Sequence, residues 1–168
     1  MKKILLPTLL FLASTLTAQT PTPAPKPVCP PTVTLNQLIA AIDSSITGPA
    51  DQDRTCFRDI FTPDARLIPT GKSADGTYKY RVLTVDDWIN AVAKSGKKSF
   101  TEKQIKYEVT TFANIAHLWS TYETDADGKF LDRGINSIQA VNDGTRWRIV
   151  EVLWQDEKDN PIPAKFLP

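Results

Sequence analysis

The second half of the chain constrains the fold most, because it consists of long strand-like segments separated by turn sequences. Apolar and polar side chains alternate in segment 100–112, and a period of two is that of a β-strand. Segments 114–124, 130–141 and 145–157 are the other expected strands. The intervening sequences DADGK and NDG are typical of hairpin turns. We therefore expect an antiparallel meander at the C-terminal end, which must curl to bury one of its faces.

Helical patterns precede this meander. Thr34 and Gln37 have the spacing of a capping box, and an apolar stripe follows them until Gly48. The expected helices cover 34–48, 54–61 and 84–96, with short strands at 66–71 and within 72–84 and a turn at 62–65. Helices first and strands afterwards predict an α+β domain.

The N-terminal segment predicts an exported protein. Residues 1–18 combine a basic start, an apolar core and a small residue at Ala18, which is the pattern of a secretory signal peptide. Segment 19–33 is proline-rich and predicts an extended linker, so the domain is expected to span 34–168. The expected location is periplasmic or extracellular, with no stable membrane anchor after cleavage.

Composition excludes several classes of function. The formal net charge is +1 without a basic cluster, so we expect no nucleic-acid partner. One histidine and two cysteines make a poor ligand set for a metal, and we expect no cofactor because the chain has no glycine-rich phosphate loop. In an exported protein Cys29 and Cys56 predict a disulfide, and two free thiols are the alternative.

Two segments resemble the nuclear transport factor 2-like (NTF2-like) superfamily, which includes ketosteroid isomerase-like and SnoaL-like proteins. FRDIFTPDARLIPTG is similar to that family's second helix and following strand, with the phenylalanine–x–x–Asp–Ala pattern at Phe61, Asp64 and Ala65. RGINSIQAVNDGTRWRIVEVLWQDE is similar to its last two strands, with tryptophan–x–isoleucine at Trp147 and Ile149. The resemblance spans roughly residues 34–157. It implies a cone-shaped curved antiparallel sheet packed on three N-terminal helices, a cavity between them, and a homodimer formed through the outer sheet face.

The resemblance also implies where isomerase chemistry would require its residues, and this chain departs from that pattern. The position of the carboxylate base falls on Ile68 or Pro69, and the position of the acidic donor falls near Ser137. Ile68 and Pro69 have no side-chain group that accepts a proton. Dehydratase relatives rely on more than one histidine, whereas this chain has only His117. An enzyme of either kind is therefore disfavoured.

His117 remains the one candidate for acid–base catalysis, because histidine titrates near neutral pH. It shares a strand face with Trp119, and that face meets either the cavity, the core or a partner. We expect a ligand pocket formed by Tyr107, His117, Trp119 and Asn136. Glu102 is interpreted as a surface charge on the polar face of its strand, with pairing to His117 as the alternative.

Three functions follow from these observations. The first is an exported domain that binds a small, partly apolar molecule in the cavity of the cone. The second is an isomerase- or dehydratase-type enzyme that uses His117 as acid or base. The third is a dimerisation or interaction module whose cavity is filled by its own side chains.

Overall fold

A computed structural model describes residues 26–158 and 160–168. The expected signal peptide 1–18 and the first part of the expected linker, up to residue 25, lie outside the described residues. The elements in chain order are α1 (Leu35–Ile46), β1 (Gly48–Pro49), α2 (Thr55–Asp59), β2 (Phe61–Lys72), β3 (Tyr78–Tyr80), α3 (Val85–Ala93), β4 (Ser99–Phe112), β5 (Ile115–Ala126), β6 (Lys129–Asn142), β7 (Trp147–Asp156) and a 3-10 turn, η1 (Ala164–Phe166).

Local sequence sets where the helices begin. The predicted capping box of α1 is present: the Thr34 hydroxyl accepts from the Gln37 backbone, and the Gln37 side chain accepts from the Thr34 backbone. Thr84 and Asp87 form the same arrangement at the start of α3. Each box satisfies backbone N–H groups that a helix start leaves without an intrahelical partner. No helix in the described part of the chain is long and apolar enough to span a membrane.

The sheet is a curled, seven-stranded layer with the order β1-β4-β5-β6-β7-β2-β3. The predicted antiparallel meander of β4 to β7 is confirmed. The expectation of a wholly antiparallel sheet is wrong for one pair, since β2 pairs with β7 in parallel. No hairpin joins these two strands, and the intervening elements are long enough to permit parallel pairing. The turn expected at 62–65 is instead an irregular stretch inside β2, where the register with β7 shifts.

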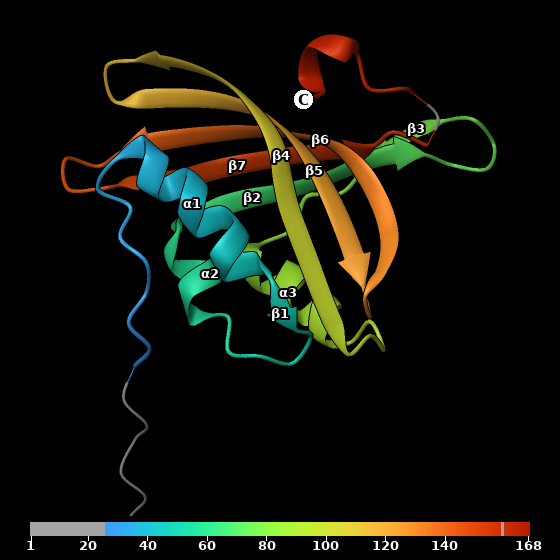
Figure 1. Ribbon diagram of the computed structural model, residues 1–168, viewed down its shortest axis with the longest axis horizontal. Helices are drawn as coiled ribbons and strands as arrows, with labels where there is room; N and C mark the ends of the chain where they lie inside the picture. Colours follow the sequence, from blue (N-terminus) through green and yellow to red (C-terminus); the bar gives the residue numbers. More distant parts are fainter. Residues whose placement is uncertain (1–25, 159) are drawn as a thin grey trace, which may run out of the picture.

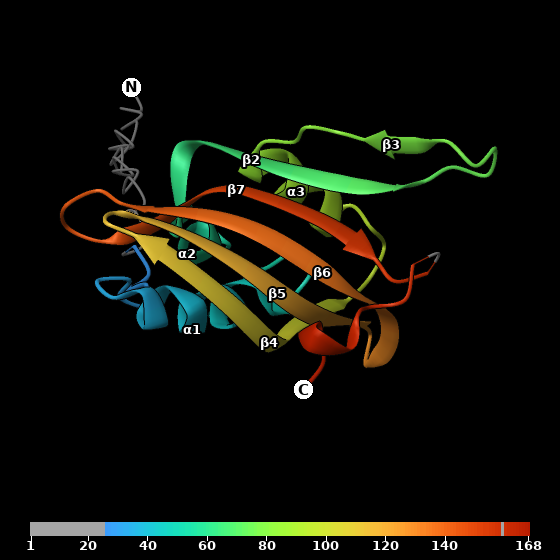
Figure 2. The same ribbon diagram turned by 90° about the horizontal axis from the view of Figure 1, so that it is seen from above.

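The concave face of the sheet curves over the three helices, and the core lies between them (Figures 1 and 2). Its most buried side chains come from α1, α2 and the inner faces of the long strands, for example Leu38, Phe57, Leu118, Ile138 and Ile149. This cone-like α+β arrangement agrees with the fold class predicted from the sequence.

Both ends of the described chain are fastened to the domain. A disulfide joins Cys29 to Cys56 at α2, and buried Thr32 accepts a hydrogen bond from the Trp147 backbone at 2.7 Å. The packed domain therefore includes residues that the sequence assigned to the linker. At the other end, η1 lies on the convex face of the sheet, where the Phe166 ring is 5.7 Å from that of Trp119.

Candidate functional site

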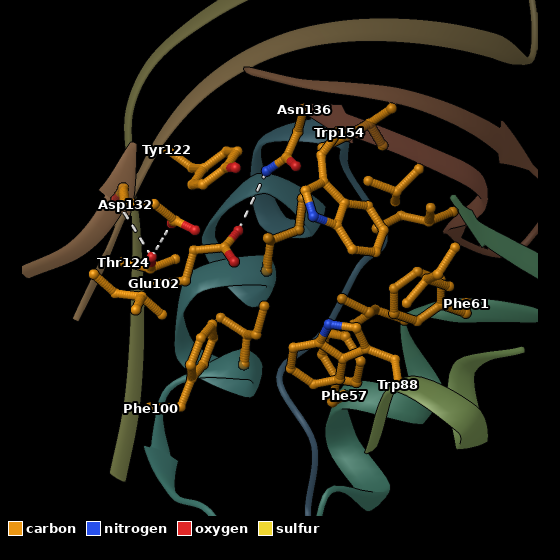
Figure 3. A pocket seen from close by; sticks show the side chains of 18 residues that line it. Phe57, Phe61, Trp88, Phe100, Glu102, Tyr122, Thr124, Asp132, Asn136 and Trp154 are labelled. Carbon is orange, nitrogen blue, oxygen red and sulfur yellow. Dashed lines mark hydrogen bonds between the residues drawn. The ribbon is translucent and has the colours of Figure 1, made fainter. Parts of the chain in front are cut away.

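A cavity of about 180 Å³ lies between the helices and the concave face of the sheet (Figure 3). Most of its wall is aliphatic or aromatic, and its polar side chains are few. The aromatic rings belong to Phe57, Phe61, Trp88, Phe100, Tyr122 and Trp154, and the remaining polar or charged groups to Glu102, Thr124, Asp132 and Asn136. Figure 3 shows Glu102, Thr124 and Asp132 together at one end, away from Phe57, Phe61 and Trp88. The cavity is thus apolar at one end and polar at the other.

A β-bulge in β4 turns Glu102 into this cavity. Glu102 and Gln104 pair with Thr124 and Tyr122 of β5, whose side chains point inward, and the register shifts between Gln104 and Lys106. The extra residue inverts the alternation, so that Lys106 on the far side of the bulge points outward. The interpretation of Glu102 as a surface charge is therefore wrong.

A hydrogen-bond network holds the Glu102 carboxylate in place. Its Oε1 accepts from Gln104 Nε2 at 2.6 Å and from Asn136 Nδ2 at 3.2 Å. Asn136 Nδ2 also donates to Gln104 Oε1 at 3.2 Å, and the buried Ser120 hydroxyl donates to the same oxygen. Because Gln104, Asn136 and Ser120 are themselves buried and bonded, the network orients Glu102 rigidly.

The environment of Glu102 favours its neutral form. Burial raises the pKa of Glu102 to about 7, and the nearby negative charges of Asp43 and Asp132 add to this effect against the hydrogen bonds from Gln104 and Asn136. Burial likewise raises the pKa of the Tyr122 phenol, so this hydroxyl stays protonated at neutral pH. A carboxyl group that changes charge near neutrality can hydrogen-bond as donor or acceptor.

Asp132 is the second carboxylate of the cavity. It lies on β6 and accepts a hydrogen bond from the Thr124 hydroxyl. Its neighbour Leu131 also lines the cavity and is 52% exposed, which places the cavity mouth at this end. Within residues 26–158 and 160–168, neither Asp132 nor Glu102 forms a salt bridge.

The structure separates the four residues expected to form the ligand pocket. Asn136 lines the cavity, and Tyr107 packs against the neighbouring core without lining it. His117 and Trp119 point to the convex face, so they do not contribute to the cavity. The physical reason is that the other face of β5 carries the small and apolar side chains that the helices cover, including buried Ala116 and Leu118.

His117 lies near Ser137 and Trp119 on the convex face. Its Nε2 lies 3.1 Å from the Ser137 hydroxyl, and its ring lies 5.2 Å from that of Trp119. Ile68, where a family base was expected, also lacks access to the cavity: it pairs with Leu153 and is buried. The carboxylates that do reach the cavity come from β4 and β6. In the described ranges no cluster of three or more potential metal ligands occurs.

No protein-family model and no curated protein matches the sequence. Solved structures with similar folds do exist. An NTF2-like protein of unknown function from Shewanella baltica has a TM-score of 0.51 at 11% identity, covering 73% of this chain and 90% of its own. Two proteins with a cystatin-like fold align similarly. The one from Caulobacter vibrioides has a TM-score of 0.52 at 18% identity, covering 75% of this chain and 89% of its own. The one from Nostoc punctiforme has a TM-score of 0.55 at 11% identity, and the alignment covers 76% of this chain and 91% of that protein. At these identities the similarity concerns the fold alone, and the chain has the NTF2-like fold.

Proposed function

We propose that this domain binds a small, mostly apolar molecule whose polar group meets Glu102 and Asn136 in the cavity. The observation that supports it is the cavity's division into an aromatic end and an oriented polar end. Cavities that bind small molecules combine an apolar wall with a few fixed polar groups in this way.

The size of the cavity limits the ligand. An apolar cavity of about 150 Å³ is known to accept a molecule of the size of benzene. A volume of about 180 Å³ therefore suits one ring with a short polar substituent. The same volume argues against an interaction module whose cavity is filled by its own side chains.

The isomerase or dehydratase alternative with His117 as acid or base has no support in the site geometry. His117 and the cavity lie on opposite faces of β5, so a substrate in the cavity cannot reach the imidazole. Binding is therefore the function that the site supports best.

Benzyl alcohol is a suitable probe, because it joins one ring to one hydroxyl. Isothermal titration calorimetry should show saturable binding at one site per chain. Val152→Phe should abolish it by filling the cavity, because Val152 lines the wall. Val150→Phe is the matched control, since Val150 on the same strand is exposed and does not line the cavity. Equal binding by both variants would place the probe elsewhere and contradict the proposal.

A further inference from the structure

The charged residues that line the cavity have only one sign. Among its described lining residues the ionisable acids Glu102 and Asp132 occur, and no lysine, arginine or histidine does. Two basic residues adjoin these acids in sequence. Lys103 is exposed, and Arg133 binds Glu157 bidentately at 2.9 and 3.0 Å. Buried Arg54 does not line the cavity, and its guanidinium donates to the carbonyls of Ile46 and Pro49. The residues that the structure describes thus supply no cation to the lining of the cavity.

The Tyr122 side chain lines the same cavity and offers a hydroxyl to it. Tyr122 is 3% exposed and lines the cavity, yet its hydroxyl forms no hydrogen bond with any residue that the structure describes. Figure 3 shows its ring next to Glu102 and Asn136. The hydroxyl is therefore free to donate to or accept from a ligand atom or water in the cavity.

The carboxylates also keep acceptor capacity. Both hydrogen bonds to Glu102 go to Oε1, and the side-chain hydrogen bond to Asp132 goes to Oδ1. Oε2 of Glu102, Oδ2 of Asp132 and the Tyr122 hydroxyl are therefore three oxygens that can accept. A primary ammonium group has three N–H donors and no acceptor, and matches such a set.

We propose that the ligand's polar group is a protonated amine, held by Glu102, Asp132 and Tyr122 while its apolar body contacts the aromatic wall. This inference rests on the proposed function and specifies its ligand class. A carboxylate ligand would meet two like charges instead, and a neutral alcohol would leave both acids without a counter-charge.

Benzylamine and benzyl alcohol form a matched pair that differs in charge and hardly in size. At pH 8, calorimetric titration of the unaltered protein should give benzylamine at least about tenfold higher affinity, because charge-assisted hydrogen bonds are roughly twice as strong as neutral ones. Asp132→Asn should reduce the preference for benzylamine over benzyl alcohol by about tenfold. Asn can still accept from Thr124, so the local geometry is kept.

Glu108→Gln is the control for charge removal, because Glu108 is exposed on the outward side of β4. It should change neither affinity by more than about twofold. Equal or tighter binding of benzyl alcohol by the unaltered protein would overturn the amine inference and leave the proposed function standing. Binding of neither probe would overturn the proposed function itself. The comparison of the two probes needs no variant, so it remains decisive if Asp132→Asn does not fold.

Discussion

Replacing Glu102 by glutamine should stabilise the protein at alkaline pH and hardly affect it in acid. The substitution keeps the size of the side chain and an oxygen that can accept from Gln104 and Asn136. It removes the carboxyl whose pKa burial raises to about 7 from an ordinary value of 4.5. Charge is thus the main property that changes.

The sign and size follow from proton linkage. Between pH 4.5 and pH 7 the folded state holds a proton on Glu102 that the unfolded state has lost, so stability falls as pH rises through this window. One pKa unit corresponds to about 1.4 kcal/mol, so the rise from 4.5 to about 7 costs the folded state about 3–4 kcal/mol at most. Above pH 7 the cost is constant, and below pH 4.5 it is absent.

Urea unfolding followed by tryptophan fluorescence measures this difference. With a slope of about 2 kcal/mol per molar, the midpoint of Glu102→Gln should exceed that of the unaltered protein by up to about 1.5–2 M at pH 8, and the two should coincide near pH 4.5. Other titrating groups cancel in the comparison. Glu108→Gln should show no such pH-dependent gain. A gain that is equal at both pH values, or absent at pH 8, would refute the claim that folding desolvates the Glu102 carboxylate.

Three further predictions concern the scaffold and the convex face. Replacing Cys29 and Cys56 by serine should lower the free energy of unfolding by about 3–4 kcal/mol in chemical denaturation, because the disulfide closes a loop over a separation of 27 residues. Gly134→Ala should lower the thermal midpoint, at a cost of about 1–3 kcal/mol, since its Cβ would lie 2.2 Å from the Gln155 carbonyl oxygen. Gly71→Ala is the control: a Cβ at Gly71 would meet no atom within 4 Å, so the thermal midpoint should change little. His117→Ala should change the benzyl alcohol affinity measured by calorimetry by no more than about twofold. A complete loss of binding would show that His117 contributes to the site.

Much of the fold could be predicted, because the signals for it are local. The capping box at Thr34 fixes where α1 begins, and the NDG turn fixes the hairpin between β6 and β7. Period-two alternation also divided β5 correctly into two sets of side chains. What the sequence did not decide was which set faces the helices. Polar His117 and aromatic Trp119 suggested a pocket, whereas the helices cover the smaller and more apolar set.

The parallel pairing of β2 with β7 could not be predicted for a related reason. Strand partners far apart in the chain are chosen by the packing of the whole domain, and no turn sequence records that choice. The inner residue Leu67 is paired with Val152, which lines the cavity, so this distant pairing also helps to shape the site.

The candidate site was missed because a single bulge changes the meaning of a regular pattern. Alternation places Glu102 on the same face as Lys106 and Glu108, and this assignment holds only if no residue is inserted between them. The register shift after Gln104 moves Glu102 to the inner face, where its neighbours become buried groups instead of water. Comparison with the family's sequence motif fails here as well, because that motif places the catalytic carboxylate at Ile68 or Pro69 on β2. The cavity takes its acids from β4 and β6, so its chemistry has to be inferred from the side chains that reach it and not from the positions that serve in other proteins of this fold.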